Sequence, residues 1–376
     1  MSATVLEALL RFLPAYRARR PRLSREQRRA IWAITHCRTP AMGGHLYGCK
    51  KCRTREFVCH SCNHRSCPQC GRAATAEWVQ REMHKRVGAP YFMVTFTLPA
   101  ELRPLFFGAR AKEAYDLFFT ASAAALRDKL AARKWLGARQ SGFTGVLHTW
   151  NQRLLFHPHI HYLVPGAGLD AGGRVVTVRS PKFLLPLPAL SRAFRKHFLG
   201  LLEAAGMPVD PEANPQHSDW GVNITPFGTG ENAIKYLGAY VCRTAIGDSR
   251  ILSITEREVT FRWIDRQNGD RPRTATVSGV EFVARYLRHV LPRGLRAIRR
   301  YGYCHPAAKA TRERVAFHTG RPLLAGAAEM PVPDVGKAPV PRCPCCGQPM
   351  TFLREVAPLR ILPRGPPDAP QQRCAS

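Results

Sequence analysis

Histidines recur at every second position in an apolar stretch of the chain, residues 154–164. If this stretch is a β-strand, alternate side chains share a face, so His159 and His161 project together while Ile160 and Tyr162 point the other way. Two imidazoles on one face can hold one divalent cation and leave coordination positions for a phosphate oxygen. The pattern therefore predicts a metal site suited to phosphate chemistry.

Two more histidines lie near this pair in the sequence. His157 falls on the same face, but Pro158 is typical of a strand start or edge, which leaves the direction of His157 open. His148 belongs to another predicted strand, 143–150, and is a candidate third ligand if the two strands pair. A hydrogen-bonded histidine cluster without a metal also remains open.

A pair of tyrosines, Tyr236 and Tyr240, lies on a predicted helix over 231–243. Residues four apart share one face of a helix, and most such aromatic pairs simply pack in a core. Beside a metal site, however, a phenol can attack a phosphodiester and give a covalent phosphotyrosine with a free 3′-OH. Lys235 and Arg243 are candidates to stabilise the phosphate.

Cysteine pairs with two intervening residues occur three times between Cys49 and Cys70. Each such turn presents two sulfurs to one ion, so two turns make a tetrahedral zinc site. Cys49 and Cys52 with Cys67 and Cys70 give a spacing close to that of a zinc ribbon, and Cys62 is expected to be a ligand too. Further candidates for zinc ligands are Cys37, His45, Cys59, Cys343 and Cys346.

The last of these pairs, Cys343 and Cys346, lies in a proline-rich stretch that begins near Met330 and is predicted to be a flexible tail. One such turn cannot complete a zinc site alone. Its expected partners are Cys304, His305 or Cys374.

The chain carries 57 Lys and Arg against 26 Asp and Glu, a formal net charge of +31. An excess of this size attracts phosphate backbones and favours nucleic acid as the partner over an anionic membrane. Candidate DNA contacts are Arg65, Arg72, Arg285 and Arg288. The sequence has neither a long apolar run nor a signal-peptide pattern, so we expect a cytoplasmic protein, in which cysteines bind metal rather than form disulfides.

Alternating helical and strand patterns predict an α+β fold. We expect three parts: 1–90 with two basic helices and the zinc-binding cysteines, 91–305 with the histidine strand and the tyrosine helix, and the basic tail 306–376. Predicted helices cover 1–36, 73–87, 105–135, 191–205, 231–243 and 280–290. Predicted strands cover 91–98, 143–150, 154–164, 222–227, 258–265 and 274–278.

Taken together, the His159-x-His161 strand, the Tyr236-x3-Tyr240 helix and the cysteine motifs resemble the HUH endonucleases, and among them the two-tyrosine rolling-circle transposases of bacterial insertion sequences. The resemblance implies a ferredoxin-like core with a flanked antiparallel sheet, and Mg²⁺ or Mn²⁺ at the two histidines. It implies that one strand of DNA is cut at an element end, that the tyrosines act in successive transfer steps, and that Tyr240 is the indispensable nucleophile.

Two other interpretations remain. The three alternating histidines, His157, His159 and His161, also occur in histidine-triad nucleotide hydrolases, which use no metal; this leaves the charge, the cysteines and the tyrosines unexplained. A zinc-containing DNA-binding protein that has lost catalysis would bind DNA in a salt-sensitive way without forming a covalent adduct.

Overall fold

The computed structural model describes residues 3–207, 209, 220–241, 244–265, 268–320 and 340–358, with residues 71–74 and 239–241 described by their backbone alone. Arg243 and Cys374 therefore lie outside the described residues. None of the helices in these ranges is long and apolar enough to cross a membrane.

The chain forms two units, each assembled from separated stretches of sequence. The first, which we call the cysteine unit, comprises Met1–Glu77, Cys242–Val290 and Pro331–Ser376. The second, the sheet unit, comprises Trp78–Val241 and Leu291–Met330. The three-part division expected from sequence stays a prediction.

Three helices and two small sheets make up the described part of the cysteine unit. The helices are α1 (Val5–Arg19), α2 (Arg25–His36) and α7 (Gly279–Arg288). The first two confirm the predicted basic pair, and each starts at a side-chain cap that satisfies a free backbone N–H: Thr4 for α1 and a Ser24–Gln27 capping box for α2. The strands β9 (Ile251–Ile254), β10 (Glu258–Asp265) and β11 (Arg271–Ser278) form one antiparallel sheet, which confirms the predicted hairpin.

The second small sheet joins sequence ends that lie far apart. It consists of β1 (Gly44–Gly48), β2 (Arg55–Cys59) and β13 (Thr351–Val356), in the order β13-β1-β2. Gly44 pairs with Val356 and Gly48 with Thr351. The prediction of a patternless tail is therefore wrong for the described residues 340–358, because β13 gains its backbone partner only from a strand about 300 residues away.

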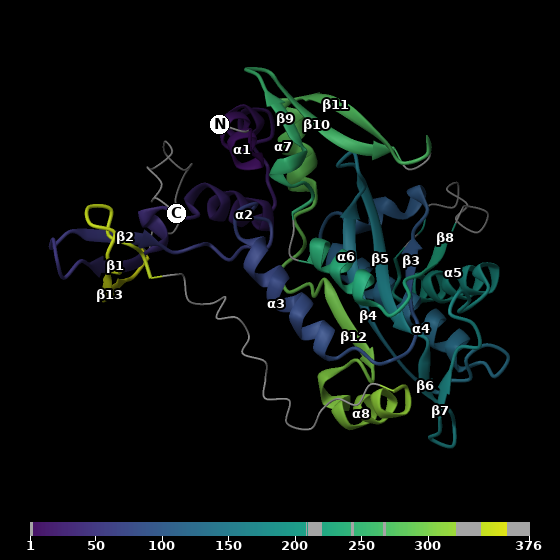
Figure 1. Cartoon of the computed structure of the whole chain (residues 1–376). Coiled ribbons are helices and arrows are strands. Elements are labelled where there is room, and N and C mark those ends of the chain that lie inside the picture. The colour runs from purple at the N-terminus through teal and green to yellow at the C-terminus, as the bar shows by residue number, and fades with distance from the viewer. Residues whose placement is uncertain are drawn as a thin grey trace. The chain divides into compact units, whose positions relative to one another are not determined.

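The sheet unit contains a seven-stranded antiparallel sheet in its described part. The order is β7-β6-β4-β5-β3-β8, and β12 pairs with β4 beside this path (Figure 1). Most of its strands were predicted; their bounds are β3 (Tyr91–Thr97), β4 (Gln140–Trp150), β5 (Phe156–Pro165), β6 (Ala167–Leu169), β7 (Val175–Thr177), β8 (Gly221–Pro226) and β12 (Ile298–Gly302).

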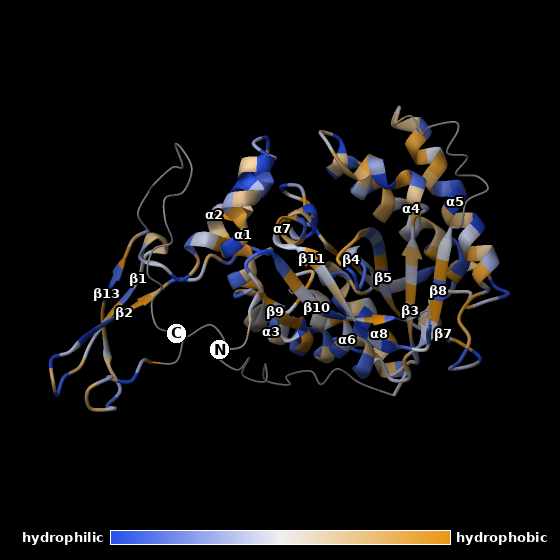
Figure 2. Cartoon of the chain, turned by 90° about the horizontal axis from the view of Figure 1, so that it is seen from above, coloured by the Kyte–Doolittle hydropathy of each residue, from blue (hydrophilic) through white to orange (hydrophobic). Residues whose placement is uncertain are grey.

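Helices cover both faces of this sheet. On one side lie α4 (Ala111–Ala131) and α5 (Leu187–Ala204), and on the other lie α6 (Glu231–Val241), α8 (Lys309–His318) and the part of α3 (Gly71–His84) that begins at Trp78 (Figures 1 and 2). Figure 2 colours β3, between the two layers, mostly as hydrophobic, as expected for a strand buried on both faces. The predicted α+β fold, with a flanked antiparallel sheet, is thereby confirmed.

The alternation of side chains along β5 divides it between the two layers. Ile160 and Tyr162 are fully buried in the core with α4 and α5, while Leu163 packs in the core with α6. The hydroxyl groups of Tyr162 and Ser122 on α4 lie 2.8 Å apart. The histidines of β5 are therefore directed to the α6 side.

Close approach of α6 to α3 depends on a glycine. A Cβ atom at Gly238 would overlap with the Val79 side chain, whereas a Cβ atom at Gly200 on α5 would meet nothing within 4 Å. Alanine at position 238 must therefore displace either Val79 or the tyrosine helix itself.

We expect Gly238→Ala to lower the free energy of unfolding by about 1–3 kcal/mol through overpacking. Gly200→Ala, the matched control in an exposed helical position, should raise it by about 0.5–1 kcal/mol because alanine favours the helix. Thermal denaturation of the two variants checks this, and equal shifts of the melting temperature would contradict the tight α3–α6 contact.

Candidate metal centres

Three histidines converge on the α6 side of the large sheet. In the register of β4 with β5, His148 lies opposite His159, and Val146 lies opposite His161. The ligand atoms of His148, His159 and His161 all lie within 4.8 Å of one another. The strand pairing that would make His148 a neighbour of the other two is confirmed, and the structure brings all three predicted residues together.

Hydrogen bonds orient two of these rings. The Nδ1 atom of His159 lies 2.7 Å from the carbonyl oxygen of His157, which can only accept, so this nitrogen carries the proton. The Nδ1 atom of His161 lies 2.8 Å from the hydroxyl of Thr95 on β3. With Nδ1 engaged in both rings, Nε2 is the nitrogen left to bind a metal.

Burial favours the neutral form of His148. Burial lowers the pKa of His148 well below its ordinary value, and the neighbouring His161 and His159 lower it further. Neutral imidazole is the form that binds metals. Because three neutral ligands leave the charge of a divalent cation uncompensated, an anionic phosphate would be a favourable additional ligand.

His157, the third alternating histidine, is engaged elsewhere. Its Nδ1 atom lies 3.2 Å from a guanidinium nitrogen of Arg103, and the group of converging ligand atoms does not include it. Burial and Arg103 both lower the pKa of His157. The three histidines that converge therefore come from two strands, β4 and β5, and not from three alternating positions of β5.

The tyrosine helix lies next to this centre. The rings of Tyr236 and His161 are nearly perpendicular, with centroids 6.5 Å apart, and Tyr236 is half-buried against Phe227. Tyr240 lies one turn further along α6, and only its backbone is described. Lys235 is exposed and its ammonium group lies 2.7 Å from Glu231.

Eight cysteines form two groups of four in the cysteine unit. One consists of Cys37, Cys62, Cys67 and Cys70, and the other of Cys49, Cys52, Cys343 and Cys346. Sulfur–sulfur distances within them are 3.3–3.6 Å, close to the roughly 3.8 Å expected between thiolates around one tetrahedral zinc ion. Both groups have the composition of a structural zinc site.

These groups differ from the pairing that the spacing suggested. Cys49 and Cys52 do not join Cys67 and Cys70, because pairing of β13 with β1 brings the Cys343 turn to them instead. Cys37, at the end of α2, completes the other group, whose loop is held to α7 by a 2.8 Å bond from the Tyr286 hydroxyl to the Ser66 carbonyl. Cys59, Cys304 and His305 belong to neither group.

His45 takes part in a third cluster in this unit. It lies opposite Glu355 of β13 and near His60, and the ligand atoms of these three residues lie within 4.8 Å of one another. The ring centroids of His45 and His60 are 4.6 Å apart.

The four arginines proposed as DNA contacts have different surroundings. Arg65 and Arg288 are exposed, while Arg285 binds Glu281 on α7 at 2.8 Å. Arg72 lies on α3, where only the backbone is described.

Comparison with known proteins places both kinds of site in known domains. Residues 142–312 match a family described as "Putative transposase", and residues 8–98 match one described as "Transposase zinc-binding domain". The first range contains the three histidines and Tyr236, and the second contains the whole Cys37 group. Cys343 and Cys346 lie outside both.

Two relatives agree with these matches. The "Putative transposase y4qJ" of Sinorhizobium fredii is 39% identical over 318 residues, covering 80% of this chain and 79% of the relative. The "Transposase for insertion sequence element IS801" of Pseudomonas savastanoi pv. phaseolicola is 28% identical over 292 residues, covering 71% and 67%. No solved structure matches the chain significantly. The chain therefore belongs to this family of insertion-sequence transposases, with a zinc-binding domain ahead of the domain that carries the histidines.

Proposed function

We propose that this transposase nicks one strand of DNA at the ends of its insertion sequence and transfers it through a covalent 5′-phosphotyrosine, as in rolling-circle transposition. The observation that carries the proposal is the location of Tyr236, and hence of its helix, beside three converging histidines. A metal-binding cluster next to a phenol has the parts needed to activate and attack a phosphodiester.

His148, His159 and His161 would hold the catalytic Mg²⁺ or Mn²⁺. Three imidazoles would leave the remaining coordination positions of the cation to water and to the phosphate oxygens of the DNA. When bound, the cation supplies charge neutralisation at the scissile phosphate. The hydrogen bonds to Thr95 and to the His157 carbonyl keep the ligand rings in place.

The tyrosine oxygen would lose its proton and attack the phosphorus atom. The bond from phosphorus to the 3′ oxygen breaks, this oxygen takes up a proton, and the 5′ phosphate stays on the tyrosine. Attack by a 3′-OH then reforms a phosphodiester and returns the tyrosine, so no ATP is needed. Two tyrosines on one helix face allow two such transfers, with Tyr240 as the indispensable one and Lys235 and Arg243 near the phosphate.

The two cysteine groups would each hold one structural zinc ion. The sheet of β1, β2 and β13 around the Cys49 group contains little apolar material, so metal binding would supply much of its folding free energy. Zinc at the Cys49 group would also fix β13 to β1. The surface so formed would contact DNA through Arg65, Arg72, Arg285 and Arg288.

Nicking is tested with purified protein, Mn²⁺ and labelled single-stranded DNA from the element ends, separated on denaturing gels. We expect an SDS-resistant protein–DNA adduct that is lost in Tyr240→Phe and in His159→Ala/His161→Ala, since these remove the nucleophile and the metal. Tyr236→Phe should block the second transfer only. His157→Ala is the matched control, and it should retain the adduct because His157 lies outside the ligand group.

An adduct that persists in EDTA or without the two histidines would refute the metal-dependent mechanism. Salt-sensitive DNA binding with no adduct on any end sequence would instead support the non-catalytic DNA-binding protein.

Zinc content tests the ligand groups. We expect two zinc ions per chain in the purified protein and one in Cys343→Ser/Cys346→Ser, because the Cys37 group stays intact. Cys345→Ser, in the same turn but with an exposed side chain outside both groups, should keep two. Elemental analysis decides, and two zinc ions in the double variant would show that the Cys343 turn is not a ligand.

A further inference from the structure

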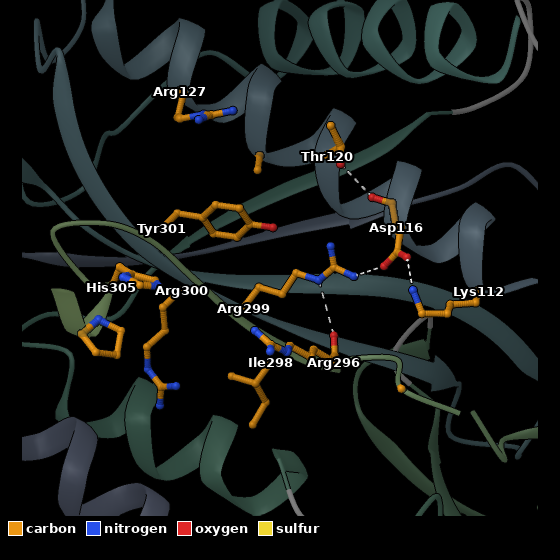
Figure 3. Close-up of a pocket in the computed structure, with 13 residues that line it drawn as sticks. Lys112, Asp116, Thr120, Arg127, Arg296, Ile298, Arg299, Arg300, Tyr301 and His305 are labelled. Atoms are coloured by element: carbon orange, nitrogen blue, oxygen red, sulfur yellow. Dashed lines mark hydrogen bonds and ion pairs between the residues drawn. The ribbon is translucent and has the colours of Figure 1, made fainter. Parts of the chain in front are cut away.

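A cavity of about 740 Å³ lies between β12 and α4 in the sheet unit (Figure 3). β12 contributes four consecutive residues to its lining, Ile298 to Tyr301, and α4 contributes residues from Lys112 to Arg127. The nicking chemistry proposed above assigns no role to it.

The lining of this cavity is strongly cationic. Its single carboxylate, Asp116, faces five cationic side chains: Lys112, Arg127, Arg296, Arg299 and Arg300. Asp116 binds Lys112 at 2.7 Å and also binds Arg299, while Arg300 binds Glu82 outside the cavity. Among the described residues, the guanidinium groups of Arg127 and Arg296 have no carboxylate partner, so their charge is available to an anion.

An aromatic ring lies among these cations. Tyr301 is half-buried and stacks on Phe143, with ring centroids 5.0 Å apart. Burial raises the pKa of Tyr301, and the charges of Arg299 and Arg127 oppose this rise, which places both arginines near the ring (Figure 3). Cations that bind a phosphate backbone, combined with an aromatic ring on which a base can stack, are typical of single-stranded nucleic-acid sites.

The cavity is also connected to the histidine centre through the sheet. Ile298 on β12 pairs with Val146 on β4, and His148 lies two residues further along β4, roughly 7 Å away. By strand alternation, Ile298 and Arg300 lie on the same face of the sheet as His148. Arg299 and Tyr301 alternate to the opposite face, toward α4, so a strand bound there would have to cross β12 to reach the histidines.

We propose that this cavity binds single-stranded DNA that flanks the cut site, holding phosphates at Arg127 and Arg296 and a base against Tyr301. The inference deepens the proposed nicking function and rests on it. A volume of about 740 Å³ is within the range of sites that take one small ligand. It therefore suits a nucleotide or two of a single strand but excludes a duplex.

The first test measures binding of a fluorescent single-stranded oligonucleotide to the full chain in EDTA, at several salt concentrations. We expect Arg127→Ala/Arg296→Ala to weaken binding about tenfold and to reduce the salt slope by roughly 1.4, or 0.7 for each lost phosphate contact. Arg133→Ala/Arg139→Ala removes the same charge from exposed positions of the same unit outside the cavity, and should change affinity less than twofold.

Equal losses in the two double variants would overturn the proposal, since only overall charge would matter. So would unchanged affinity in Arg127→Ala/Arg296→Ala, or equal weakening of duplex and single-strand binding by this variant. Competition by millimolar inorganic phosphate that abolishes the difference between the two pairs would show a free-phosphate site instead.

The second test addresses the base. Wild type should bind oligothymidine more tightly than an abasic strand of equal length. Tyr301→Phe should keep this preference because the ring remains, and Tyr301→Leu should lose it. Retention of the preference in Tyr301→Leu would exclude stacking at this position.

Because binding is measured without metal, the cavity and the nicking mechanism can fail separately. If Arg127→Ala/Arg296→Ala loses binding and the wild type forms no adduct on any strand, the DNA-binding cavity is supported and the nicking mechanism is rejected. If the same variant binds normally and forms the adduct at the wild-type rate, the nicking mechanism is supported and the DNA-binding cavity is rejected.

Discussion

The backbone pairing of β4 with β5 is the constraint on which the histidine centre depends. A slip of one residue would turn His159 and His161 into the core under α4 and α5, and would move Ile160 and Tyr162 out of it. The register is fixed from that core: Tyr162 is fully buried beside Ser122, and Gly145 leaves room for its ring, since a Cβ there would lie 2.5 Å from it. Apolar packing on one face of the sheet thus determines the chemistry on the other.

The same register buries His148 beside His159 and His161 in a chain of net charge +31. Protonating His148 would place a cation in a buried site beside two other rings, and burial lowers the pKa of His148. The ring of His157 lies beside that of His159, with centroids 5.4 Å apart, but its Nδ1 atom contacts Arg103 and it is not part of the ligand group. This arrangement argues against a metal-free histidine triad, because the third member of the cluster comes from β4.

The sequence predicted the parts of the site whose signals are local. The period of two along β5 and the helical spacing of the tyrosines each depend on neighbouring residues. The pairing of the cysteine turns is not a local signal, because any two such turns can supply the four ligands of a tetrahedral ion. Cys52 lies beside Cys343, 291 residues away, only because β13 pairs with β1. The cavity beside β12 was missed for the same reason, as Arg127 and Arg296 are 169 positions apart.

The two units differ in what stabilises them. In the sheet unit, large aromatic clusters on both faces supply apolar burial that needs no cofactor. Around β1 and β13 the buried hydrophobic cluster is Tyr47, Cys49, Cys343 and Met350, so half of it consists of candidate zinc ligands. Removing metal would break the zinc–sulfur bonds that join the Cys49 and Cys343 turns and leave little else to hold the sheet. Zinc loss should therefore disrupt the small sheet while the histidine centre stays folded, because the forces that form the two sites are independent.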